Sequence, residues 1–92
     1  MKLIQHFVNG NIFPGKSDRT GKVFNPATGI QEAEVKLGTK EDLNNAVKFA
    51  KEAFKEWSAK PPIVRARIIF KYKELIEKNS DEITKMIVSE HG

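Results

Sequence analysis

The chain contains no cysteine among its 92 residues. This absence excludes a disulfide framework, a catalytic thiolate and any cysteine-ligated metal site within these residues. Histidine is almost as scarce, with His6 near one end of the chain and His91 near the other. Because a zinc site needs three or four ligands, typically paired at short spacing, we expect no metal site and interpret both histidines as surface or end-of-element residues.

Long apolar runs are also missing. No stretch approaches the roughly 20 apolar residues that a membrane-spanning helix requires. Residues 1–6 carry one lysine but no apolar run long enough for a signal peptide. We therefore expect a protein of the cytoplasm, or of the mitochondrial matrix in a eukaryote, with no membrane partner.

The sequence lacks a phosphate-binding glycine loop. Gly10, Gly15, Gly21 and Gly29 fall in neither a GxGxxG nor a GxxxxGK[ST] pattern, and we interpret each as a turn residue. No serine, threonine or lysine stands in a recognisable setting beside a base and a third, orienting group. The sequence therefore predicts no catalytic, no cofactor-binding and no metal-binding residue in this chain.

The residues that are present describe one small folded unit of the α+β class. Six Phe, one Trp and one Tyr are too many large apolar groups for a disordered chain. A domain of this length buries roughly 60–65% of its unfolded surface. We divide the single partial domain, residues 1–92, into a β-ribbon over residues 1–38 and a three-helix segment over residues 39–92.

Residues 1–38 have the pattern of short strands joined by tight turns. Asn9 and Gly10 lie between two short apolar segments, and this dipeptide favours the type I′ turn of a two-residue hairpin. Residues 33–37 alternate between apolar and charged side chains, the period of a strand with one solvent-facing side. With a further strand at residues 22–24, the simplest assembly is an antiparallel meander of three or four strands.

The apolar pattern changes to a helical period after residue 38. Thr39, with Asp42 three residues on, resembles a capping box at the start of the first helix. Apolar residues then recur at spacings of three and four as far as Trp57. Pro61 and Pro62 end this helix and can open the second, because a proline at the first helical position loses no hydrogen bond.

The second helix, residues 63–78, has an apolar set broader than one stripe, which predicts contacts on two sides. Its members are Val64, Ile68, Ile69, Phe70, Tyr72, Leu75 and Ile76. Asn79 and Ser80 are expected to cap a third helix, and Gly92 lies where a helix-ending glycine would.

Two polar pairings are expected on the second helix. Arg65 stands at its start, where an arginine commonly bonds a carboxylate or carbonyl of a neighbouring loop, although the Arg65 and Arg67 pair is also the one spot suited to a specific ligand. Glu74 and Lys78 are spaced four apart for a surface salt link.

Basic residues concentrate in the middle of the chain. Residues 48–73 carry eight Lys or Arg against two acids, a local charge of +6. Phe54 and Trp57 lie on the apolar stripe of the first helix, whereas Lys48 and Lys51 lie off it. Because nucleic-acid binding needs aromatic and basic groups on one surface, we interpret the lysines as a solvated face and expect no nucleic-acid partner.

Several short motifs, in this order, resemble the N-terminal segment of the NAD-dependent aldehyde dehydrogenases. They are Phe7-Val8-Asn9-Gly10, Val23-Phe24-Asn25-Pro26-Ala27-Thr28-Gly29 and Ala53-Phe54-Lys55-Glu56-Trp57. A narrower likeness to the CoA-acylating methylmalonate-semialdehyde dehydrogenases is carried by Pro61-Pro62-Ile63-Val64-Arg65-Ala66-Arg67-Ile68-Ile69-Phe70, Asp81-Glu82-Ile83 and Glu90-His91-Gly92. The resemblance covers the chain from about His6 to Gly92.

This resemblance implies part of the α/β aldehyde dehydrogenase fold, in which a Rossmann-type NAD domain, a catalytic domain and an oligomerisation strand form the subunit. In that family a cysteine attacks the aldehyde, NAD accepts hydride, and CoA takes up the acyl group. No position of this chain matches the catalytic cysteine, the general-base glutamate or the cofactor loop. NAD and CoA are therefore implied for the full-length family, with no cofactor held by this chain alone.

Three hypotheses follow. The first is an N-terminal scaffold fragment of a methylmalonate- or malonate-semialdehyde dehydrogenase, inactive alone, whose partner is the remainder of the subunit and whose exposed apolar helix faces favour self-association. The second is a free-standing interaction or assembly module derived from that family. The third is a small basic protein that binds nucleic acid or an anionic surface.

Overall fold

The computed structural model describes all 92 residues and consists of five short strands followed by three helices. The strands are β1 (Lys2–Ile4), β2 (His6–Val8), β3 (Asn11–Phe13), β4 (Thr20–Phe24) and β5 (Gln31–Lys36). The helices are α1 (Lys40–Ala59), α2 (Pro62–Lys78) and α3 (Ser80–His91). The predicted order, a β-ribbon and then three helices, is confirmed.

The strands form two separate sheets, whereas the sequence predicted a single antiparallel meander. β4 and β5 pair antiparallel, and β1 adds to the other edge of β5 in parallel orientation. β2 and β3 form an antiparallel sheet of their own. The parallel pairing of β1 joins residues about thirty positions apart, a long-range contact for which a three-residue strand carries no local signal.

The expected hairpin is present between β2 and β3. Asn9 and Gly10 both have positive φ, 52° and 76°, as the type I′ turn requires. The register places Phe7 opposite Ile12, and both side chains are more than 70% exposed. A hairpin of only two short strands is marginally stable by itself, so this one depends on what packs against it.

Helix α1 begins with the predicted capping box. The Asp42 amide donates to Thr39 Oγ1 at 3.1 Å, and the Thr39 amide donates to Asp42 Oδ2 at 3.0 Å. These two bonds satisfy amides that have no partner within the helix.

Thr39→Ala should shorten α1 from its start. Removal of the hydroxyl leaves the Asp42 amide without its acceptor, a loss of about 1 kcal/mol for a typical N-cap. Hydrogen exchange of the Asp42 amide should therefore accelerate about fivefold. The control is Ser58→Ala near the end of α1, where the hydroxyl contacts only the Lys55 carbonyl at 3.4 Å; equal acceleration at Asp42 in both variants would contradict the capping role.

The links between the helices agree with the sequence in one place and differ in another. Arg65 Nε donates to the Lys60 carbonyl at 3.2 Å, so this arginine bonds the neighbouring loop as expected. Asn79, expected as a side-chain cap of α3, instead donates from Nδ2 to the Leu75 carbonyl at 2.8 Å and thus closes α2. The reason is geometric: with one residue between the helices, the Asn79 side chain reaches back to the open carbonyls of α2.

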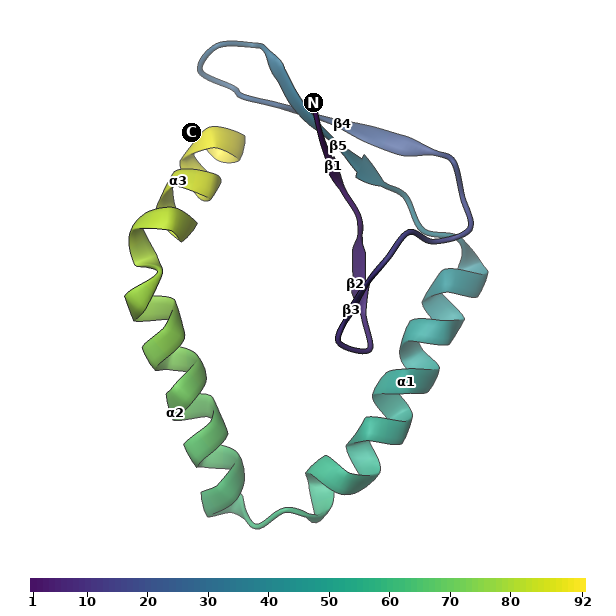
Figure 1. Cartoon of the computed structure of the whole chain (residues 1–92), viewed down its shortest axis with the longest axis vertical. Coiled ribbons are helices and arrows are strands. Elements are labelled where there is room, and N and C mark those ends of the chain that lie inside the picture. Colours follow the sequence, from purple (N-terminus) through teal and green to yellow (C-terminus); the bar gives the residue numbers. More distant parts are fainter.

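The three helices and the sheets form an open arch (Figure 1). α1 and α2 are its two arms, which meet at residues 60–61, and α3 extends from α2 toward the turn at residues 25–29. The hairpin β2–β3 projects between the arms. The arch is 48 × 34 × 16 Å, so its smallest dimension is little more than one helix diameter of about 10–12 Å.

The arch has almost no core. Only Ala33 and Asp42 are buried, and 21 large hydrophobic side chains are exposed. The radius of gyration is 16.9 Å, whereas a compact domain of this length has about 12 Å. Stable domains need two packed layers around a core, and this chain supplies one layer.

Candidate functional site

The residues examined as sites in the sequence lie far apart or in ordinary structural positions. His91 is exposed at the end of α3, as expected. His6 on β2 is half-buried and its Nε2 atom is shielded from solvent, so its prediction as a surface residue was wrong. No group of three or more His, Cys, Asp or Glu side chains is placed to hold a metal ion. Gly10, Gly15 and Gly29 have positive φ in turns and loops, so their role is conformational. Gly21 instead lies within β4, opposite Val35, so its prediction as a turn residue was wrong.

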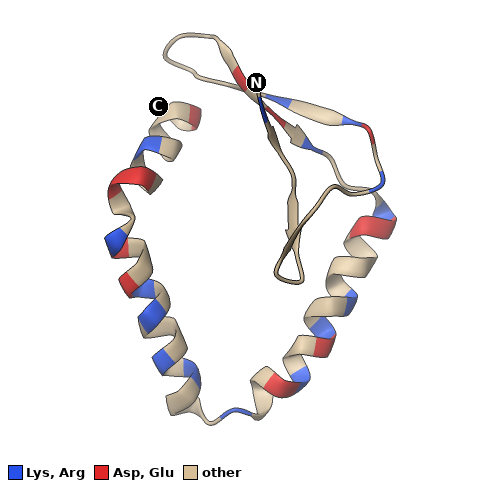
Figure 2. Cartoon of the chain, viewed as in Figure 1, with Lys and Arg blue, Asp and Glu red and all other residues tan.

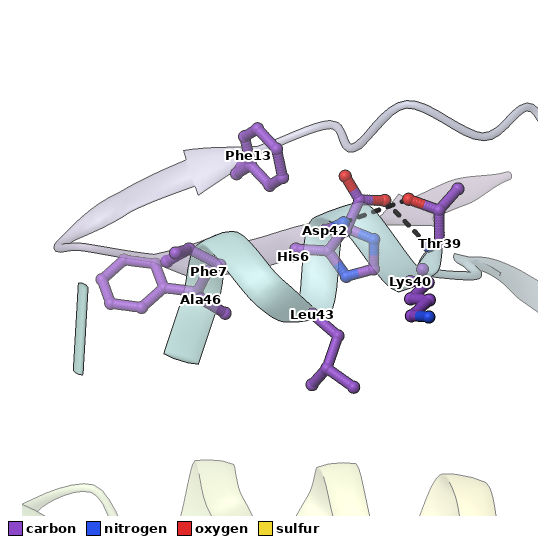
Figure 3. Close-up of a pocket in the computed structure, with 10 residues that line it drawn as sticks. His6, Phe7, Phe13, Thr39, Lys40, Asp42, Leu43 and Ala46 are labelled. Atoms are coloured by element: carbon purple, nitrogen blue, oxygen red, sulfur yellow. Dashed lines mark hydrogen bonds between the residues drawn. The ribbon is translucent and has the colours of Figure 1, made fainter. Parts of the chain in front are cut away.

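The largest hollow lies where the hairpin β2–β3 approaches the first half of α1 (Figure 3). Its volume is about 560 Å³. The lining residues are His6, Phe7, Val8, Phe13, Gly38, Thr39, Lys40, Asp42, Leu43 and Ala46. The walls are apolar, and the polar groups gather at one end, around the first turn of α1.

Asp42 is the one buried charged residue of the chain, with 6% of its surface exposed. Its Oδ2 atom accepts the Thr39 amide at 3.0 Å and the Lys16 amide at 3.3 Å. The hydrogen bond from the Thr39 amide is the largest cause that holds the pKa of Asp42 below its usual value, and the Lys16 amide adds to it against the opposing effect of burial. The carboxylate therefore stays charged and joins the loop before β4 to the start of α1.

Lys16 makes a second link at the same junction. Its ammonium forms an ion pair with Glu41, and the hydrogen bond to Glu41 is the largest cause that raises the pKa of Lys16. Both side chains are more than half exposed, so the pair adds little to stability.

Burial of Asp42 was not predicted. The capping box signals that Asp42 faces the Thr39 amide, but the residues that cover it come from a loop 26 positions earlier in the chain. The close approach depends on Gly15, where an added Cβ would lie 3.0 Å from Asp42 Oδ2. A glycine before a lysine in a loop is too common a pattern to identify that contact.

The charged side chains of α1 and α2 are mixed in sign (Figure 2). On α2, Lys71 pairs with Glu74 at 3.5 Å and Lys73 pairs with Glu77 at 3.6 Å. The expected link between Glu74 and Lys78 is therefore replaced by one to Lys71, a residue three positions earlier on the same side of the helix.

The main exposed apolar surface of α2 has helical spacing. Ile68, Tyr72, Leu75 and Ile76 lie on one face, and each is at least 40% exposed. Ile63 and Phe70, seven residues apart, lie about 140° around the helix from Ile68 and are also exposed. The apolar groups of α2 thus face two directions, and nothing within the arch covers either group. None of the three helices has the length and apolar character needed to cross a membrane.

Comparison with known proteins decides what kind of protein has this arrangement. The model of the aldehyde dehydrogenase family matches residues 13–92. The chain belongs to the aldehyde dehydrogenase family.

Individual relatives agree with this aldehyde dehydrogenase assignment, and those with similar sequences include malonate-semialdehyde dehydrogenases. The chain is 39% identical over 92 residues to a malonate-semialdehyde dehydrogenase 2 of Oceanobacillus iheyensis. This alignment covers 100% of the chain and 19% of the relative. It is 41% identical over 91 residues to the protein of that name from Bacillus cereus. This alignment covers 99% of the chain and 19% of the relative. The chain thus spans about a fifth of the length of these aldehyde dehydrogenases.

Solved aldehyde dehydrogenase structures contain the same fold. A protein of Sinorhizobium meliloti assigned as a methylmalonate-semialdehyde dehydrogenase, in complex with NAD, matches with a TM-score of 0.96 at 39% identity over 100% of the chain and 19% of its own. The methylmalonate-semialdehyde dehydrogenase of Oceanimonas doudoroffii matches with a TM-score of 0.94 at 39% identity and the same coverage. The matching segment of each of these two longer proteins therefore has the same open-arch conformation.

Proposed function

We propose that the chain is an N-terminal scaffold segment of an NAD-dependent, CoA-acylating methylmalonate- or malonate-semialdehyde dehydrogenase, and that it has no activity alone. The observation that carries the proposal is the structural match to the Sinorhizobium meliloti protein, at a TM-score of 0.96. The match includes the whole of this chain but only 19% of that protein. On this proposal, the chain contributes a surface to the enzyme and its partner is the remainder of the subunit.

The surface area of the arch supports such a partner. The chain has 7709 Å² of accessible surface, whereas a folded monomer of this mass has roughly 5,400 Å². If a partner covers this excess of about 2,300 Å² with an equal area of its own, the total buried area is about 4,600 Å², within the range of about 2,000–5,000 Å² for obligate interfaces. The exposed apolar side chains of the three helices and of the hairpin β2–β3 contribute to this area.

The residues present do not fit NAD. A dinucleotide pyrophosphate binds where a glycine-rich turn opens a helix and leaves its first amides free. At α1 the Thr39 and Asp42 amides are already bonded within the capping box, and the buried Asp42 carboxylate would repel a phosphate. At α2 the first positions are Pro61 and Pro62, and Pro62 has no amide to donate. We therefore propose that NAD is bound by other parts of the enzyme.

The proposal is tested by complementation. A relative such as the Oceanobacillus iheyensis enzyme is prepared without the segment that matches this chain, and NADH formation from malonate semialdehyde, NAD and CoA is followed. We expect no NADH from either part alone. We expect the mixture to form a stable complex on a sizing column and to recover activity, because the chain restores the missing layer.

The matched variants are Ile68→Asp, on the main apolar face of α2, and Lys78→Glu, at the exposed end of the same helix. Ile68→Asp should abolish complex formation because it buries an unpaired charge. Lys78→Glu should leave complex formation unchanged. Turnover by the chain alone, or a chain that fails to bind the truncated relative, would reject the proposal.

A further inference from the structure

Two polar atoms at the junction of the hairpin β2–β3 and α1 are buried without a hydrogen-bond partner. They are His6 Nε2 and Asp42 Oδ1. Buried polar atoms in folded proteins are nearly always hydrogen-bonded, because an unpaired one costs its lost hydration. Here the two unpartnered groups have complementary chemistry, since an imidazole nitrogen can donate and a carboxylate can only accept.

The two side chains also approach the same point. A Cβ added at Gly15 would lie 3.0 Å from Asp42 Oδ2 and 3.1 Å from His6 Nε2. The sum of these distances, 6.1 Å, is the largest separation that Asp42 Oδ2 and His6 Nε2 can have. Figure 3 shows the imidazole and the carboxylate at the same end of the hollow, beside Thr39.

We propose that His6 Nε2–H and the Asp42 carboxylate form a hydrogen-bonded pair that latches the hairpin β2–β3 to the first turn of α1. Rotation of the imidazole toward Asp42 completes the bond. The pair resolves the unpartnered donor and uses the remaining acceptor capacity of the carboxylate, which the Thr39 and Lys16 amides occupy only in part.

The neighbouring charges leave His6 as the natural partner of Asp42. The Lys16 ammonium is bound by Glu41, and only the Lys16 amide reaches Asp42. The ring of His6 also lies near Phe13, with ring centroids 6.2 Å apart and planes tilted by 39°. The imidazole thus lies between Phe13 of β3 and the first turn of α1, where it can donate to the Asp42 carboxylate.

The latch would set the direction in which the hairpin projects. The hairpin is joined to β1 by Gln5 alone and to β4 by the loop of residues 14–19, and it makes no strand pairing outside itself. A polar pair between β2 and α1 fixes this otherwise marginal element, and with it the position of the exposed Phe7 and Ile12.

Amide hydrogen exchange of the 92-residue chain tests the latch. In His6→Phe, which keeps an aromatic ring beside Phe13 but removes the donor, amides of β2, β3 and the first turn of α1 should all exchange about tenfold faster. Asp42→Asn keeps a capping oxygen but removes the charge, and should accelerate the same two regions. The double variant should exchange no faster than the more affected single variant, because both substitutions break one interaction.

The matched controls are His91→Phe, at the exposed histidine of α3, and Glu41→Gln, at the exposed acid beside Asp42. Each should change exchange in the hairpin less than twofold. The proposal is overturned if His6→Phe accelerates the hairpin but not α1, if the two single effects multiply in the double variant, or if these amides already exchange at unstructured rates in the unsubstituted chain.

Discussion

Purified alone, the chain will sediment at micromolar concentrations as species heavier than its 10.4 kDa monomer. The physical reason is the excess surface of about 2,300 Å² relative to a folded monomer of this mass. Much of it is apolar and contiguous along α2, where Ile68, Tyr72 and Leu75 are all exposed. Exposed apolar patches of more than a few hundred Å² drive association, and two copies of a one-layer arch can supply each other with the second layer.

Ile68→Asp should weaken this self-association at least about tenfold, because each interface would bury an unpaired carboxylate. Lys78→Glu changes charge at an exposed position of the same helix and should leave the association constant nearly unchanged. Analytical ultracentrifugation over a concentration series measures both. A monomer that melts cooperatively and binds no copy of itself would show that the arch rearranges to cover its own apolar faces.

Self-association and the proposed role in a larger subunit rest on the same faces, but different results test them. If the chain associates with itself and also binds the truncated relative, the second partner should displace the first, since both cover the α2 face. Self-association without any binding to the relative would leave the surface argument intact and remove the proposed function.

The elements that could be predicted from the sequence are those defined by neighbouring residues. The hairpin at Asn9 and Gly10, the capping box at Thr39 and the helix boundary at Pro62 each depend on residues at most three positions apart. The family resemblance rested on short motifs of the same kind, and the comparisons confirm it.

The features that could not be predicted depend on contacts between distant segments. β1 pairs in parallel with β5, and the loop at Lys16 covers Asp42, in both cases across more than 25 residues. A three-residue strand and a glycine in a loop have no periodicity to signal such contacts. Asn79 had two helix ends within reach, and propensity alone does not decide between them.

Gly15→Ala should be the most disruptive single substitution at the junction of α1, with a cost of about 3 kcal/mol in the local free energy of opening. Gly15 has φ of +75°, which an alanine adopts at a cost of about 1–2 kcal/mol. The new methyl group would also lie 3.0 Å from Asp42 Oδ2 and 3.0 Å from His6 Cδ2. Asp42 is held by the Thr39 amide, so relief of the new contact would have to move the Gly15 loop or the His6 ring.

Gly29→Ala is the control for a global effect of an alanine at positive φ. Gly29 has nearly the same φ, +72°, but no atom within 4 Å of the added Cβ, so this variant meets the backbone cost without the contact. Exchange of the Leu43 amide, which donates to the Thr39 carbonyl at 3.1 Å, reports opening of the first turn of α1. Gly15→Ala should accelerate this exchange about a hundredfold and Gly29→Ala hardly at all, because residues 25–29 lie far from α1 in the arch. Equal effects would mean that an alanine at positive φ destabilises the whole chain, and that the loop does not hold Asp42 and His6 in place.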